Sequence, residues 1–429
     1  MNLKLVRIFL MFILYILFHI TYVDIIVPEF GYLGFVNKDY SFYMLLMHCL
    51  IILVLTSLQL FMKISFYNII YNIFLIMIVY GQSVVSLHSN TNELFGYVII
   101  PTLFLFTIDL LDKKNIKIKR KQFNVENRYF AILSIIFSII LIVPFLKNIC
   151  SINLSNLLLN DIYDSRLNTR SDNSNIMDYL YSSIARVIFP FLIVFFWFRN
   201  KKLYSVIVFG FIILLFLLNG AVKSILFGAL ATIVFYPFRY SVKNVLFIIT
   251  INVFFAYSII SYRLFDSITM ADYLRRIFYL PAYLFSIYKQ TFSGNFTYYS
   301  QTILGSIFNI PNKIDNVAQF IGEQVLKQDG MVANAGIFVE GYISMGMIGV
   351  IINSLIFVLL IFILKCLNFK PQYFGIIFTY MYIINTSFLE TLLITHGLLF
   401  LIIFGYFFIP TDNKRRIKIE NSFNNNSNI

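Results

Sequence analysis

The sequence predicts an all-α, polytopic integral membrane protein with about 12 transmembrane helices. Its 429 residues are 59% hydrophobic and only 12% charged, and the mean hydropathy is +0.82. Soluble domains carry about 25% charged residues. Most apolar runs reach the ~20 residues that a helix needs to cross a bilayer. Segments of roughly ten alternating residues, typical of a membrane β-barrel, do not occur.

Apolar runs place these helices along the chain. The first nine are expected within residues 1–262, which include a polar external loop at 147–178. A large external loop at 263–335 follows helix 9, helices 10 to 12 occupy residues 336–410, and 411–429 is a basic, Asn-rich cytoplasmic tail. The predicted spans are 5–23, 41–62, 66–87, 94–111, 129–146, 179–198, 203–219, 221–238, 245–262, 336–364, 372–389 and 391–409.

Charge sorting orients the helices. With the N-terminus inside and alternating spans, roughly two thirds of the 33 Lys and Arg residues fall on inner segments. Roughly three quarters of the 20 Asp and Glu residues fall outside. Both termini are therefore expected in the cytoplasm and both long loops outside. The same bias explains the net charge of +13 without nucleic acid as a partner.

The cysteines and histidines give no pattern of a metal centre. Cys49, Cys150 and Cys366 fall in separate segments, and the four histidines form no metal-like pair. The predicted outer segments also lack an Asp-x-Asp pair, which would hold a divalent metal on a diphosphate. We expect no metal and no cofactor, and a diphosphate would be neutralised by Arg and Lys instead.

Several cations lie on the predicted outer side, against the usual sorting of charge. Arg166 and Arg170 are four residues apart and would share a helix face; the alternative is a solvated, salt-bridged loop. Arg186 lies about 10 Å inside a predicted helix. It either lines a polar cavity, snorkels to the surface or forms a structural ion pair. Lys223 begins the helix predicted at 221–238. We interpret these four residues as candidates for binding a diphosphate.

The large external loop carries further cations. Apolar pairs recur at helical spacing over residues 268–289, although Pro281 interrupts them. This pattern indicates a helix lying on the membrane surface or, as an alternative, a short packed lid helix. Either would hold Arg263, Arg275 or Arg276 at the level of the lipid headgroups.

Residues 329–350 form the centre of the predicted active site. This stretch begins polar, includes Asn334 as a substrate-binding candidate, and becomes an apolar helix that carries Glu340. A desolvated carboxylate at this position is the best candidate for a general base. A structural salt bridge with an outer arginine is the alternative.

These residue types suit a sugar carried on a polyprenyl diphosphate. The diphosphate is a good leaving group, so cations that stabilise its charge would replace an acid catalyst. The acceptor hydroxyl needs a base within hydrogen-bond reach. Aromatic residues would line a vestibule for the sugars, and the candidates are Tyr283, Tyr288, Tyr298 and Tyr299.

The chain resembles the O-antigen or oligosaccharide repeat-unit polymerases, the Wzy type. The resemblance comprises the helix number, both external loops and the Asn-Gly-Ala-Val-Lys-Ser turn at 219–224. Its best local part is Ala-Asn-Ala-Gly at 333–336, continuing into Glu-Gly-Tyr at 340–342 and Gly-Met-Ile-Gly at 346–349. The resemblance implies metal-independent transfer of a glycan from undecaprenyl diphosphate onto a lipid-linked repeat unit.

The resemblance implies that the reaction takes place at the outer face of the bacterial cytoplasmic membrane. The lipid bilayer and undecaprenyl-diphosphate-linked oligosaccharides are then the partners, together with a chain-length regulator and a flippase. Two alternatives stay open: a flippase or transporter of lipid-linked oligosaccharides, and another membrane glycosyl- or acyltransferase such as an O-antigen ligase. The long external loop lacks the histidine that the related ligases use there.

Overall fold

The computed structural model describes residues 3–63, 65–91, 93–120, 175–219, 223–312, 314, 316–328 and 330–412. Within these residues the regular elements are all helices, and one isolated antiparallel β-bridge joins Phe369 to Thr411. Four described helical stretches are long and apolar enough to cross a membrane: Lys4–Leu33, Phe66–Ser89, Tyr240–Phe265 and Ile337–Cys366. The prediction of an all-helical protein with membrane-spanning helices is confirmed at this level.

The chain divides into two compact units. Unit 1 draws on residues 1–114, 238–362 and 380–396, and unit 2 on residues 115–237, 363–379 and 397–429. The helix predicted at 129–146, most of the loop at 147–178 and nearly all of the tail lie outside the described residues. All contacts of the candidate site below are within unit 1.

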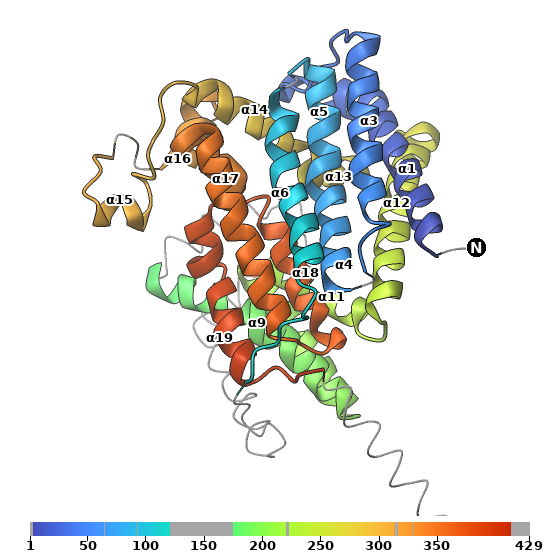
Figure 1. Ribbon diagram of the computed structural model, residues 1–429, viewed down its shortest axis with the longest axis vertical. Coiled ribbons are helices and arrows are strands. Elements are labelled where there is room, and N and C mark those ends of the chain that lie inside the picture. Colours follow the sequence, from blue (N-terminus) through green and yellow to red (C-terminus); the bar gives the residue numbers. More distant parts are fainter. Residues whose placement is uncertain are drawn as a thin grey trace, which may run out of the picture. The chain divides into compact units, whose positions relative to one another are not determined.

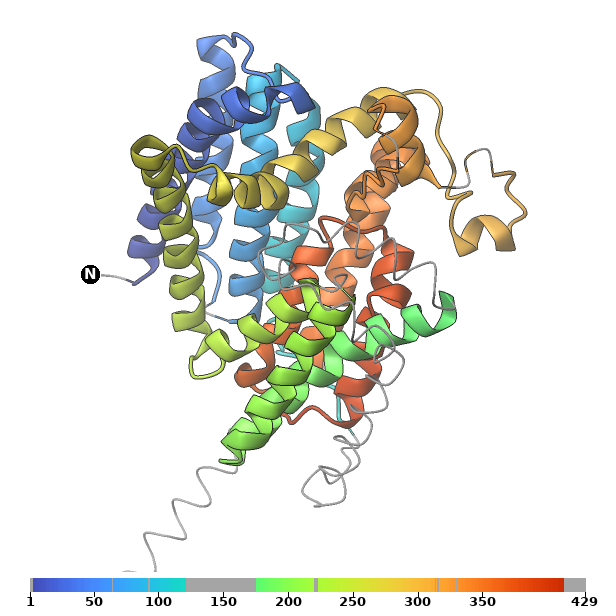
Figure 2. The ribbon, with the colours of Figure 1, turned by 180° about the vertical axis from the view of Figure 1, so that it is seen from behind.

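Unit 1 is built around a bundle of long helices that run alongside one another (Figures 1 and 2). Its N-terminal elements are α1 (Leu3–Thr21), α2 (Val27–Phe30), α3 (Phe42–Leu58), α4 (Phe66–Phe74), α5 (Gly81–Ser89) and α6 (Glu93–Leu111). A π-helical turn, Leu75–Tyr80, joins α4 to α5 without a break. After residue 238 come α12 (Tyr240–Phe265), α13 (Thr269–Leu274), α14 (Leu280–Phe292), α15 (Ile303–Ile307), α16 (Val317–Phe320) and most of α17 (Ile337–Cys366).

The helix formed by α4 and α5 is the centre of this bundle. Almost all of its residues are buried, polar as well as apolar. Its polar side chains have partners on other helices: Arg7 Nη1 donates to Asn68 Oδ1 at 2.6 Å, and Asn72 Nδ2 donates to Asn244 Oδ1 at 2.9 Å. These hydrogen bonds offset part of the cost of burying the groups.

A helical segment crosses the bundle on one side (Figure 2). It consists of α13, a π-helical turn at Arg275–Tyr279, and α14. Pro281 does not interrupt it, because this residue occupies the first turn of α14, where a missing N–H costs least. Phe278 and Tyr279 are buried, and the Tyr279 hydroxyl donates to the Phe18 carbonyl at 2.8 Å. These contacts favour the packed helix over one that only lies on the membrane surface.

Unit 2 contains α9 (Asn175–Phe198), α10 (Lys202–Asn219), α11 (Lys223–Phe235) and α19 (Leu398–Phe407), and α18 (Phe374–Ile383) begins in it. The spans predicted at 372–389 and 391–409 are too long. With 10 residues each, α18 and α19 are about 15 Å long, half of a bilayer's hydrocarbon core. The polar run Asn-Thr-Ser at 385–387 ends the first, and Gly397 at φ +79° precedes the second.

Candidate active site

Helix α17 is a hairpin, which corrects the single span predicted at 336–364. Met345 and Gly346 have non-helical backbone angles, and the φ of +62° at Gly346 is one that favours glycine. Asn353 Nδ2 donates to the Ile337 carbonyl at 2.7 Å, although a straight helix would hold these residues about 24 Å apart. Residues 337–344 therefore fold back against residues 347–366.

Two glycines let the arms of this hairpin touch. A Cβ atom added to Gly349 would lie only 1.9 Å from the Gly341 carbonyl oxygen, and one on Gly341 would lie 2.5 Å from the Gly349 oxygen. Small residues allow helix backbones to approach in this way. The longer arm, residues 347–366, is about 30 Å long and still suffices to cross a bilayer.

Glu340 lies on the short arm and is almost completely buried. The residue is 1% exposed, and its Oε2 accepts a hydrogen bond from the Leu389 N–H at 2.6 Å. The Ile337 N–H donates to the Ile384 carbonyl at 3.2 Å. Glu340 thus fixes the irregular segment between α18 and α19 against the hairpin, through a hydrogen bond from a backbone N–H.

Residues from the large loop close the hairpin at its turn. The Thr297 and Tyr298 N–H groups donate to the Ile343 and Ser344 carbonyls at 2.9 and 3.0 Å. The Tyr299 hydroxyl donates to Asn353 Oδ1 at 2.9 Å. Burial and the nearby charge of Glu340 raise the pKa of Tyr299 to about 12, so this hydroxyl stays protonated at neutral pH.

The other tyrosines predicted for a vestibule have different places. Tyr288 is fully buried, and its hydroxyl donates to the Ala333 carbonyl at 2.8 Å. Tyr283 packs against Phe35, with ring centroids 5.0 Å apart. Tyr298 is exposed. Tyr298 and Tyr299 are therefore the two of these four tyrosines that flank the hairpin turn.

A shallow polar pocket of about 510 Å³, largely open to the surface, lies beside this site. Its carboxylate is Glu390, the residue after Leu389, and Glu390 Oε2 accepts a hydrogen bond from the Ile303 N–H at 2.9 Å. Glu340 and Glu390 are close enough to repel each other electrostatically. Hydroxyl and amide groups make up most of the remaining polar lining, from Ser300, Thr302, Ser306, Asn309 and Asn312.

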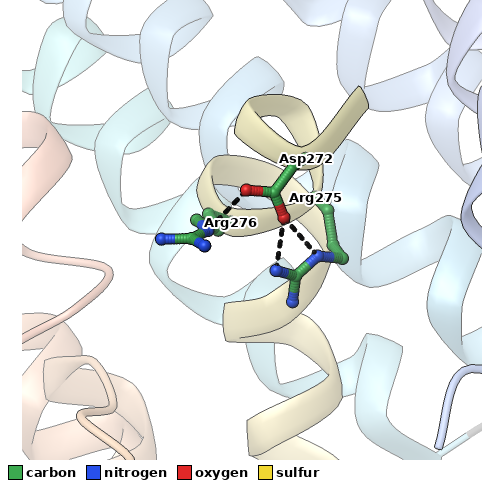
Figure 3. A network of polar contacts seen from close by, with 3 residues as sticks. All are labelled: Asp272, Arg275 and Arg276. Atoms are coloured by element: carbon green, nitrogen blue, oxygen red, sulfur yellow. Dashed lines mark hydrogen bonds and ion pairs between the residues drawn. The ribbon is translucent and has the colours of Figure 1, made fainter. Parts of the chain in front are cut away.

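The arginines predicted in the large loop have carboxylate partners other than Glu340. Arg263 Nη2 lies 2.7 Å from Asp24 Oδ2, and both side chains are exposed. Arg275 and Arg276 share Asp272, at 2.5 and 2.8 Å (Figure 3). Arg275 is buried over the Phe30 ring, whereas Arg276 is partly exposed. Of the three, Arg263 and Arg276 are the ones accessible to a ligand.

The remaining predicted residues belong to different parts of the chain. Arg186 is buried in α9 and Lys223 begins α11, both within unit 2. Asn334 is exposed and lies three positions before Ile337, where α17 begins. Arg166 and Arg170 lie outside the described residues. Within unit 1, Asn334 is not among the described partners of Glu340.

Three histidines that the sequence left separate come together in unit 1. His19 Nδ1 lies 3.3 Å from His88 Nε2, and His48 Nδ1 lies 3.1 Å from Ser83 Oγ. The Tyr15 hydroxyl joins the same serine at 2.8 Å. In the part of the chain that the structure describes, no group of three or more His, Cys, Asp or Glu residues has an arrangement that could hold a metal ion.

Comparison with protein-family models, characterised proteins and solved structures gives no match to this chain.

Glu390 is the site residue that the sequence interpretation missed. It stands in a polar run, Asn-Thr-Ser at 385–387, Glu-Thr at 390–391 and Thr-His-Gly at 395–397, between two apolar stretches. His396 belongs to this run, and its Nε2 lies 2.8 Å from Ser387 Oγ. Polar and ionisable residues inside an apolar region indicate function. The density of polar residues in this run is the sequence feature that indicates Glu390 as a site residue.

Proposed function

We propose that this protein polymerises a bacterial surface polysaccharide, of the O-antigen or capsule kind. It would transfer a glycan from undecaprenyl diphosphate onto a lipid-linked repeat unit at the outer face of the cytoplasmic membrane. The supporting observation is the pocket beside Glu390, which presents hydroxyl and amide groups in a chain whose helices suit a membrane. Such groups hydrogen-bond sugar hydroxyls.

The two carboxylates suit different roles in this reaction. Glu390 lines the pocket, so it can accept the proton of an attacking sugar hydroxyl. The hydroxyl oxygen then bonds to the anomeric carbon, and the bond from that carbon to the diphosphate breaks. Polyprenyl diphosphate leaves with the electron pair. The burial of Glu340 and its bond to the Leu389 N–H favour a positioning role in place of the predicted role as base.

The leaving diphosphate needs positive charge at headgroup depth. Arg263 and Arg276 are accessible in the large loop. Arg166, Arg170, Arg186, Arg275, Lys223 and Asn334 complete the set proposed from the sequence. Arginine suits this role because its guanidinium donates two parallel hydrogen bonds to phosphate oxygens.

A topology of about 12 spans, with both termini in the cytoplasm, forms part of the proposal. In a variant without its native cysteines, Lys327→Cys is expected to react with a membrane-impermeant maleimide in intact cells. Lys113→Cys is expected to react only after permeabilisation, because it follows α6 on the side rich in basic residues. Both lysines are exposed, so equal labelling of the two in intact cells would contradict the proposed orientation.

The function itself is tested with purified protein in liposomes that contain a polyprenyl-diphosphate-linked oligosaccharide repeat. We expect products that grow by whole repeats and release of one polyprenyl diphosphate for each bond formed. A chelator is expected to leave the rate unchanged, because the proposed chemistry needs no metal. Products of a single length would contradict a polymerase. So would the absence of any product when the substrate is the repeat unit made by the host's own glycosyltransferases.

A flippase or transporter of lipid-linked oligosaccharides is the second candidate. The α17 hairpin and the break between α18 and α19 favour it, because secondary transporters often build their sites from discontinuous helices. The same liposomes separate the two functions. A transporter would move the repeat unit between leaflets without lengthening it, whereas the polymerase would lengthen it in one leaflet.

A further inference from the structure

The short helix α15 exposes apolar side chains on one edge. Ile307 is 63% exposed and Phe308 is 70% exposed, and Ile303 and Leu304 are each about half exposed. Figures 1 and 2 show this segment projecting sideways beyond α16 and α17. Four large apolar side chains in six consecutive positions form a continuous patch, and such a patch marks an interaction surface.

The long arm of α17 also exposes apolar side chains, which face lipid if α17 crosses the membrane. Ile348 and Leu355 on the long arm of α17 are 61% and 54% exposed. The backbone of Thr297 and Tyr298 is bonded to the last turn of the short arm, next to Ile348. The chain then reaches α15 within a few residues, so α15 follows closely on the segment that is bonded to the hairpin.

The opposite edge of the α15 segment is polar. Ser300, Thr302 and Ser306 line the pocket that contains Glu390. One short segment therefore separates a polar pocket from exposed apolar side chains, the arrangement of an element that lies at a membrane interface.

We propose that the α15 edge, formed by Leu304, Ile307 and Phe308, inserts among the acyl chains of the surrounding bilayer. The proposed occupant of this surface is lipid, because one short segment carries both exposed apolar side chains and polar residues that line the pocket, in a chain whose α17 is long and apolar enough to cross a membrane. Insertion holds the polar pocket at the depth of the lipid headgroups. A substrate whose lipid tail stays in the bilayer reaches the pocket sideways, without leaving the membrane. This inference does not depend on the proposed reaction.

The single tryptophan of the chain makes the test direct. Trp197 is first replaced by phenylalanine, and Phe308→Trp is introduced into that variant. The purified protein is then reconstituted in phosphatidylcholine–phosphatidylglycerol vesicles. We expect blue-shifted emission, strong quenching by lipids brominated on the acyl chain, and iodide quenching about threefold weaker than at a solvated site. The matched control is Gln319→Trp, an exposed polar position on α16 in the same loop.

Two outcomes would overturn the proposal. Equal iodide quenching of the tryptophans at 308 and 319 would show that the edge is in water. Protection from iodide without quenching by brominated lipid would show that a second copy or another protein covers it. The same quenching is expected for Ile307→Trp, which replaces Phe308→Trp as the reporter if that variant fails to accumulate.

Discussion

Replacing Glu390 by glutamine is expected to lower the rate of polymer formation by about 10²–10⁴-fold, the usual contribution of a general base. Glutamine can still accept the Ile303 N–H bond, so the segment keeps its place while the proton acceptor is lost. The measurement is the initial rate of polyprenyl diphosphate release in liposomes. Glu323→Gln is the matched control, because Glu323 is a carboxylate of the same loop that bonds Gln319 outside the pocket.

Two substitutions of Glu340 separate catalysis from positioning. Glu340→Gln keeps an oxygen for the Leu389 N–H and is expected to retain most of the activity. Glu340→Leu leaves that buried N–H without an acceptor, at a cost of about 1–3 kcal/mol, and is expected to lose activity together with thermal stability. If Glu340→Gln is inactive while Glu390→Gln is active, the roles are reversed and Glu340 is the base, as the sequence alone suggested.

Hydropathy predicted the helical regions well because burial in lipid depends on composition over a window of residues. The helices at 66–89 and 240–265 begin and end within a few residues of their predicted limits. The same windows cannot detect a reversal of direction. Residues 337–366 are apolar apart from a few positions such as Glu340, Asn353 and Lys365. The turn at Met345 and Gly346 therefore leaves the hydropathy unchanged, and the pattern predicts one span.

The candidate site was predicted in part. Sequence position identified Glu340 as buried, and the structure agrees. Its partner is a backbone N–H from a segment about fifty positions away, which no local pattern reveals. The pairing of Arg275 and Arg276 with Asp272 was within reach, because spacings of three and four residues meet on a helix face.

Gly349→Ala is expected to destabilise the protein by about 1–3 kcal/mol, the range for inserting a methyl group where packing is already tight. The added Cβ would meet the Gly341 carbonyl oxygen at 1.9 Å, so the hairpin arms must separate. The matched control is Gly210→Ala in α10, where a Cβ meets nothing within 4 Å. The measurement is the midpoint of thermal unfolding in detergent for both variants.

The sign of this effect distinguishes a hairpin from a straight helix. In a straight membrane helix, alanine at position 349 would face no opposing backbone, and replacing glycine would stabilise the helix by about 0.5–1 kcal/mol. In the hairpin the same methyl group is driven into the opposite arm. A rise in the midpoint for both variants would therefore show that residues 337–366 form one uninterrupted span. A fall for Gly349→Ala alone requires the reversal at Gly346, which brings Glu340 against the segment that carries Glu390.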